Sequence, residues 1–239
     1  MALKSIFFLN SFIIFFLNVL GIFFIRHFLL KNKILLDNLD KTQSVSKKKN
    51  VVLIGGIILI TNSLLISNNF FSQVNIYLFV IFLLGLFSDL YNFLKAKIKF
   101  LLIFILSFIF LYLNNSYLIG TISIDLIDKN FLNLLFVKII FTSFCLTLYI
   151  SGNNMIDGIN GNSIGHSILV LSMICFVVID KHQLDFVELK SNIYLIYVFI
   201  ILIIFNFFNK IFLGDNGSYL SGGYVALTTI FLVGFYDLN

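Results

Sequence analysis

The chain has 239 residues, of which 60% are apolar and only 11% are charged, and its mean hydropathy is +1.05. This composition excludes an ordinary water-soluble domain, because it supplies far more apolar surface than one core can bury. The net charge of +5 does not indicate nucleic-acid binding, since the lysines lie in short segments beside apolar runs.

Eight apolar stretches approach the roughly 20 residues that a helix needs to cross a bilayer core. We interpret the first as a helix and not as a signal peptide, because no small-residue cleavage site follows it. The sequence therefore predicts an all-α polytopic membrane helix bundle in which residues 1–239 form a single transmembrane domain. The predicted spans lie near residues 5–26, 51–67, 76–93, 99–114, 131–150, 163–180, 191–208 and 218–236.

The lysines and the arginine indicate which loops face the cytoplasm. Most of them lie in or beside the predicted loops that share one face, whereas Lys4, Lys129, Lys181 and Lys190 lie on the other side. By the positive-inside rule, we expect the first face to be cytoplasmic and the amino terminus to lie outside. The loops on the expected cytoplasmic face are 27–50, 94–98, 151–162 and 209–217.

Three aspartates lie on this predicted cytoplasmic face, at the ends of apolar runs. Asp89 lies in GLFSDLYNFLKAKIKF, Asp157 in SGNNMIDGINGN and Asp215 in NKIFLGDNGSYLSGG. Carboxylates at the membrane edge are costly, so they are candidates for a functional role. Each also has a local structural explanation, since Asp89 could simply be an interfacial carboxylate at a helix end, DGING suits an Asx-type turn, and Asp215 could cap the next helix.

Taken together, the polar residues of this face suit an anionic substrate held through Mg²⁺. This metal takes few protein carboxylates and keeps positions for water and phosphate oxygens. Asp89 and Asp215 could supply the carboxylates. The amides that would gather beside them are Asn153, Asn154, Asn160 and Asn206.

Two of these segments carry a family resemblance. KIFLGDNGSYLSGG is close to the pattern K-I/V-F-L/M-G-D-x-G-S-x-x-x-G, and NNMIDGINGN is similar to N-x-I/L/T/V-D-G-I/L-D/N-G. Both patterns, in this order, are typical of the polyprenyl-phosphate N-acetylhexosamine-1-phosphate transferases (glycosyl transferase family 4). This family includes phospho-N-acetylmuramoyl-pentapeptide transferase and the undecaprenyl-phosphate N-acetylglucosamine-1-phosphate transferases. The resemblance covers residue 37 to about residue 223.

The resemblance implies an enzyme that transfers an N-acetylhexosamine 1-phosphate from a UDP-sugar to undecaprenyl phosphate or another polyprenyl phosphate. UMP is released and Mg²⁺ is required. Such a step initiates the synthesis of peptidoglycan, lipopolysaccharide or another surface glycan. The implied location is the cell inner (plasma) membrane, with multiple spans and the active face in the cytoplasm; a homodimer is compatible with it.

The resemblance also implies a role for each candidate residue. Asp215 would bind Mg²⁺, and Asp89 would be a second metal ligand or the carboxylate that assists the attack of the lipid phosphate. The expected substrate-binding residues are Asn154, Asp157 and Asn160 for the nucleotide, Asn206 near the end of the preceding helix, and one of Lys47, Lys48 and Lys49 for phosphate.

The sequence departs from the family pattern in ways that leave two alternatives. The family has paired aspartates where this chain has Ser88 and Asp89, and we expect the chain to lack the family's carboxyl-terminal helices and last cytoplasmic loop. The first alternative is therefore a truncated or degenerate relative that binds polyprenyl phosphate or a partner without catalysis. The second is a small membrane transporter, which is disfavoured because the acids lie at helix ends on one side.

Overall fold

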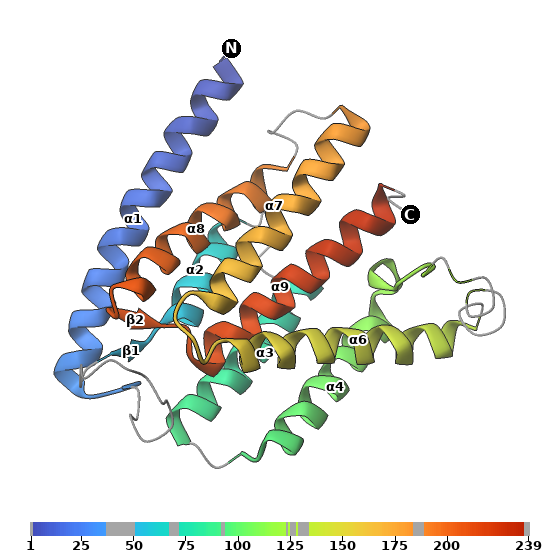
Figure 1. The fold of residues 1–239 in the computed structure, drawn as a ribbon, viewed down its shortest axis with the longest axis horizontal. Helices are drawn as coiled ribbons and strands as arrows, with labels where there is room; N and C mark the ends of the chain where they lie inside the picture. Colours follow the sequence, from blue (N-terminus) through green and yellow to red (C-terminus); the bar gives the residue numbers. More distant parts are fainter. Residues whose placement is uncertain are drawn as a thin grey trace.

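The structure is a computed structural model that describes residues 2–36, 51–66, 72–91, 94–122, 124, 128, 134–183 and 189–236. These residues form eight α-helices, one short 3-10 helix and two two-residue strands (Figure 1). The elements are α1 (Ala2–Asn32), β1 (Val52–Leu53), α2 (Gly55–Ile66), α3 (Gln73–Tyr91), α4 (Ala96–Leu113), η1 (Asn115–Tyr117), α6 (Leu135–Ile156), α7 (Asn162–His182), α8 (Lys190–Phe207), β2 (Ile211–Phe212) and α9 (Gly214–Phe235).

The predicted all-α polytopic membrane bundle is confirmed. Six of the described helices, α3, α4, α6, α7, α8 and α9, are long and apolar enough to cross a membrane. Their outer surfaces carry exposed apolar side chains such as those of Phe176 and Phe207, as a lipid-facing surface requires. The protein is therefore a multi-pass membrane protein.

The prediction of a full span at residues 51–67 is wrong. Residues 52 and 53 form strand β1, and α2 has 12 residues, which at 1.5 Å per residue is roughly 18 Å and too short for a bilayer core of about 30 Å. The segment is apolar throughout, so its sequence alone resembles a continuous span. Its first residues are extended because they pair with β2, which lies far away in the sequence.

This two-stranded parallel sheet brings two helix amino termini together. Val52 pairs with Ile211 and Leu53 with Phe212. Each strand leads directly into a helix, β1 into α2 and β2 into α9. The first turns of α2 and α9 therefore lie side by side at the same end of the bundle.

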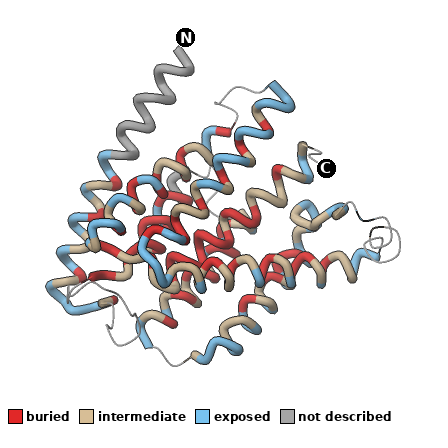
Figure 2. Tube along the Cα trace, in the orientation of Figure 1, coloured by how far each residue is buried: buried red, intermediate tan, exposed pale blue. Residues whose placement is uncertain are grey.

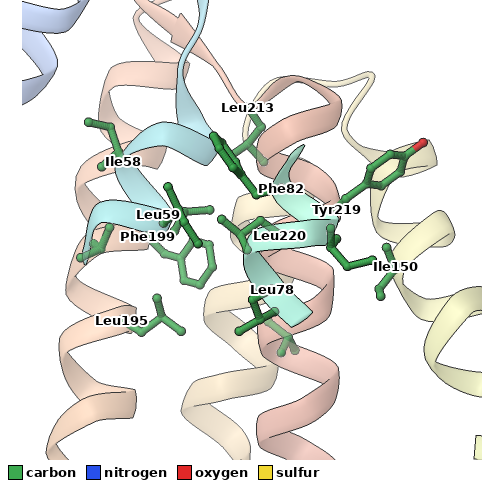
Figure 3. Packing of buried hydrophobic residues seen from close by; sticks show 14 of the residues in the cluster. Ile58, Leu59, Leu78, Phe82, Ile150, Leu195, Phe199, Leu213, Tyr219 and Leu220 are labelled. Carbon is green, nitrogen blue, oxygen red and sulfur yellow. The ribbon is translucent and has the colours of Figure 1, made fainter. Parts of the chain in front are cut away.

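Helix α9 occupies the centre of the bundle. It packs against α2, α3, α6 and α7, and Figure 2 shows buried residues along much of its length. Small residues allow this close packing, since a Cβ atom at Gly222 would lie 3.0 Å from the Cα of Ile150 in α6. Around Leu220 of α9 lie fully buried apolar side chains from four other helices, namely Leu59, Leu78, Ile150 and Phe199 (Figure 3).

Candidate functional site

One end of the bundle gathers polar groups from five helices. The amino termini of α2, α4 and α9 meet the carboxyl termini of α3 and α6 there, because the backbone N–H of Gly56 in α2 and side chains of α3, α4 and α6 bond to residues 215–218 of α9. The structure brings Asp89, Asp157 and Asp215 to this end. Residues that are distant in the sequence therefore form one polar cluster, which we call the carboxylate cluster.

Asp215 lies in the first turn of α9, where the helix dipole favours a negative charge. Its Oδ2 accepts hydrogen bonds from the Ser88 hydroxyl and from the Lys99 ammonium, both at 2.5 Å. The side chains of Lys99 and Asp215 are 18% and 22% exposed, so the ion pair is accessible to water. Both contacts fall on Oδ2, so Oδ1 of Asp215 is available to a ligand as far as the described residues are concerned.

Asp89 has a different set of partners, all of which belong to the first turn of α9. Its Oδ1 accepts the backbone N–H of Asp215 at 3.0 Å, and its Oδ2 accepts the backbone N–H of Asn216 at 2.9 Å and the Asn216 amide at 2.5 Å. The residue that precedes α9, Leu213, provides no side-chain cap. Asp89 therefore caps α9 from a neighbouring helix and satisfies N–H groups that the helix leaves unpaired.

Gly214 makes room for this cap. Its φ of +70° lies in the left-handed region, and a Cβ atom there would lie 2.8 Å from Oδ2 of Asp89. Asn216 completes the arrangement by accepting the backbone N–H of Gly56 at 2.8 Å. The carboxylate of Asp89 and the amide of Asn216 thus fix the relative positions of α2, α3 and α9.

The end of α6 forms the second wall of the carboxylate cluster. Asn154 accepts the Ser218 hydroxyl at 2.9 Å, and Asn153 donates to the Ser218 carbonyl at 2.7 Å and to the Ser221 hydroxyl at 2.8 Å. Asp157 follows as the C-cap of α6. Burial raises the pKa of Asp157 well above its usual range, and the nearby carboxylates of Asp215 and Asp89 raise it further.

The remaining candidate residues lie apart from these contacts. Asn160 is exposed in the turn between α6 and α7, where its amide donates to Asn209 at 2.5 Å. Asn206 is 2% exposed, and its amide donates to the carbonyl of Ile211 at 3.2 Å, which fixes the turn before β2. Lys47, Lys48 and Lys49 lie outside the described residues.

The donor set can be compared with what Mg²⁺ requires. Among the described residues, no group of three or more Asp, Glu, His or Cys side chains could hold a metal by itself. Mg²⁺ needs no such group, because it binds through one or two carboxylates and completes its shell with water and phosphate oxygens. Asp215, with an available oxygen and the half-buried Asp157 nearby, fits this requirement better than Asp89, whose oxygens already accept three hydrogen bonds.

Sequence reasoning missed two residues of the cluster. Lys99 served only as evidence for topology, although it is the second-last residue of the segment GLFSDLYNFLKAKIKF that also contains Asp89. Asn216 directly follows Asp215 and was not singled out. A polar residue near a candidate carboxylate in the sequence is a weak signal, and only the fold shows that Lys99 contacts Asp215 and that Asn216 contacts Asp89.

Comparison with known families finds a match over the region that contains the carboxylate cluster. Residues 71–233, more than half of the chain, match the family model described as glycosyl transferase family 4. The matched region includes all three aspartates together with Lys99 and Asn216. No curated protein shows a significant match to the chain.

Proposed function

Since the chain belongs to glycosyl transferase family 4, a family of polyprenyl-phosphate sugar-1-phosphate transferases, we propose that it transfers an N-acetylhexosamine 1-phosphate from a UDP-sugar to undecaprenyl phosphate. UMP would leave, and the product would start a cell-wall or surface glycan. The observation that carries the proposal is the carboxylate cluster, which joins Asp215, Asp157 and Lys99 at one end of a membrane bundle.

The proposed reaction joins two anions, so the site must reduce their repulsion. An oxygen of the lipid phosphate attacks the β-phosphorus of the UDP-sugar, a new P–O bond forms, and the bond to the UMP phosphate breaks. Mg²⁺, held by Asp215 with the help of Asp157, would supply charge neutralisation for the pyrophosphate. The chain's own residues would bind and position the phosphates.

Lys99 and the helix amino termini provide these positioning groups. The Lys99 ammonium contacts Oδ2 of Asp215 and is exposed enough to contact a phosphate oxygen as well. The first turns of α2 and α9 point their positive dipole ends toward the same region. Asn154, which Ser218 holds in place, would orient the nucleotide beside them.

Transfer of label tests the proposal directly. Membranes that contain the folded protein, undecaprenyl phosphate, Mg²⁺ and a UDP-N-acetylhexosamine with a labelled sugar should form a labelled lipid. Asp215→Asn should lower the rate by at least about 100-fold, because it removes the charge that holds the cation. Asp180→Asn is the control, since Asp180 is an exposed acid near the carboxyl end of α7, away from the carboxylate cluster. Equal loss in both variants would contradict the assigned role of Asp215.

Ser88 favours a second candidate function, that of a relative which binds polyprenyl phosphate without catalysis. Its hydroxyl donates to Asp215 at the position where the family pattern has a carboxylate, so the site holds one negative charge fewer. Folded protein that binds polyprenyl phosphate but forms no labelled lipid with any UDP-N-acetylhexosamine would support this candidate and exclude the first.

A further inference from the structure

A cavity of about 450 Å³ lies at the end of the bundle opposite to the carboxylate cluster. It is formed mainly by the first two turns of α3, the first two turns of α8 and the last half of α9. Asp215 and Phe231 stand at opposite ends of α9, and their 16 intervening steps correspond to roughly 24 Å. The cavity is therefore separate from the site proposed for sugar-phosphate transfer.

Most of the cavity wall is apolar or aromatic, although Ser63, Asn75 and Thr228 also line it. Leu78, Leu195, Leu227 and Leu232 are buried residues of its wall. Phe231 has its ring centroid 5.5 Å from that of Tyr117 and 5.5 Å from that of Phe235. Aromatic rings of this kind concentrate at the level where the hydrocarbon core meets the headgroups. The cavity thus offers an apolar chamber that begins at the membrane interface.

The part of the cavity lined by the start of α8 has a positive character. Lys190, Ser191 and Asn192, the first residues of α8, line it, and among the described residues Leu189, which precedes the helix, provides no side-chain cap. The first N–H groups of an uncapped helix and a nearby ammonium both favour an anion. Lys190 is exposed, and none of the described residues that line the cavity is acidic.

The hydroxyl of Tyr224 is a second and independent sign of a ligand. Its oxygen is buried and has no hydrogen-bond partner among the described residues, and Tyr224 lines the same cavity. An unpaired buried hydroxyl is unfavourable, so a bound group with an acceptor oxygen would relieve this cost. A hydrocarbon chain by itself has no such oxygen.

We propose that the cavity binds one anionic glycerophospholipid. Its phosphate contacts Lys190 and the amino terminus of α8, an ester carbonyl accepts the Tyr224 hydroxyl, and an acyl chain packs among the buried leucines. Free phosphate would leave the apolar chamber unused. A polyprenyl phosphate has no ester carbonyl for Tyr224, so the chemistry of the cavity separates this ligand from the proposed substrate lipid.

Photocrosslinking of lipids in nanodiscs tests the proposal. The full chain is reconstituted in phosphatidylcholine with a trace of photoreactive phosphatidylglycerol, or of phosphatidylcholine that has the same photoreactive chain, and the labelled peptides are identified by mass spectrometry. We expect phosphatidylglycerol to label the peptides of the cavity wall, in α8 and the last half of α9, at least about 5-fold more strongly than phosphatidylcholine.

Three variants separate the parts of the site. Lys190→Glu should lower this labelling at least about 5-fold, whereas Lys181→Glu, at an exposed lysine on the same membrane face outside the cavity, should leave it unchanged. Lys190→Gln serves if the charge reversal prevents folding. Tyr224→Phe should lower the labelling about 2-fold or more. If the Tyr224 hydroxyl does not contact the lipid, its removal should leave the labelling unchanged.

Several outcomes would overturn the proposal. Equal labelling by the two lipids would show that the cavity does not select an anionic headgroup. Labelling that Lys190→Glu does not change would show the same. Loss of labelling in millimolar inorganic phosphate would indicate a site for the free anion. Displacement of phosphatidylglycerol by a small excess of undecaprenyl phosphate would indicate a second site for the substrate lipid.

Discussion

At the scale of single residues, Asp89 and Asp215 are neighbours with different partners. Asp89 accepts three hydrogen bonds, all from the first turn of α9, whereas Asp215 contacts the mobile side-chain groups of Ser88 and Lys99. Backbone donors cannot leave without unwinding the helix, but a hydroxyl and an ammonium can turn toward a ligand. We therefore propose a stabilising role for Asp89 and a binding role for Asp215.

This division predicts different costs for removing each carboxylate. Asp89→Ala should lower the free energy of unfolding by about 2–4 kcal/mol, because charged hydrogen bonds contribute about 1.5–3 kcal/mol each and are not additive. Asp215→Ala should change it by less than about 1 kcal/mol, since its ion pair with Lys99 is partly exposed. Thermal unfolding of both variants in detergent without divalent cations measures the difference. Similar midpoints for the two variants would contradict the capping role.

Asp157 gives the molecule a predicted pH dependence. Burial and the neighbouring carboxylates raise the pKa of this side chain when the protein is folded, so the folded state holds a proton that the unfolded chain releases. Stability from this group is therefore fully present below the ordinary carboxyl pKa and is lost as the pH rises through the raised pKa.

We expect the midpoint of thermal unfolding in EDTA to fall as the pH rises above about 4, and Asp157→Asn to have a weaker dependence. Melting curves of the two proteins across a pH series provide the measurement. Parallel curves would show that Asp157 is solvated in the folded state.

At the scale of elements, the contact between α3 and α9 depends on Gly85. A Cβ atom there would lie 2.5 Å from the Cα of Asn216 and 2.6 Å from the carbonyl oxygen of Asp215, so the helices must separate to admit it. Gly85→Ala should cost about 1–3 kcal/mol in stability and lower transferase activity, because it moves Asp215 away from Ser88.

Gly152→Ala provides the matched control for this prediction. Gly152 also lies inside a helix, α6, but nothing lies within 4 Å of a Cβ atom built on it. Alanine should therefore be neutral there or stabilise the helix by up to about 1 kcal/mol. Unfolding midpoints and label transfer are measured on both variants. If Gly152→Ala lowers stability and activity as much as Gly85→Ala does, close helix contact is not the reason for the effect at Gly85.

The same elements show how far the sequence can predict the fold. Runs of about 20 apolar residues identify α3, α4, α6, α7, α8 and α9, because a bilayer imposes a length on each span. Strand β1 could not be predicted, since Val52 and Leu53 are apolar residues whose extended backbone depends on a partner strand more than 150 residues away. Local composition does not contain information about such long-range pairing.

The candidate site was predictable to a similar degree. The motifs locate Asp89, Asp157 and Asp215 beside the same membrane face, because successive spans alternate in direction. Which oxygen accepts which donor depends on the fold, so the sequence predicted Asp89 as a metal ligand without revealing that α9 supplies its three donors. The direct contact of Lys99 with Asp215 was hidden for the same reason.

At the scale of the whole molecule, α7 connects the two ends of the bundle. It has 21 residues, roughly 31 Å at 1.5 Å per residue, which matches the thickness of a bilayer core. Asn160 precedes it at the end of the carboxylate cluster, and Asp180 lies in its last turn near the opposite end. Both side chains are exposed, so these two positions report on the two faces of the membrane.

The lysine distribution predicts that the carboxylate cluster faces the cytoplasm. Cysteine substitution tests this orientation, in a background where the two native cysteines of the apolar helices, Cys145 and Cys175, are replaced by alanine. A membrane-impermeant thiol reagent should label Asp180→Cys in intact cells and Asn160→Cys only after the membrane is opened. The reverse pattern would place the cluster outside the cell, away from cytoplasmic UDP-sugars, and would exclude the proposed donor. Labelling of both positions from one side would contradict the crossing of α7 itself, and with it the separation of the transferase site from the lipid cavity.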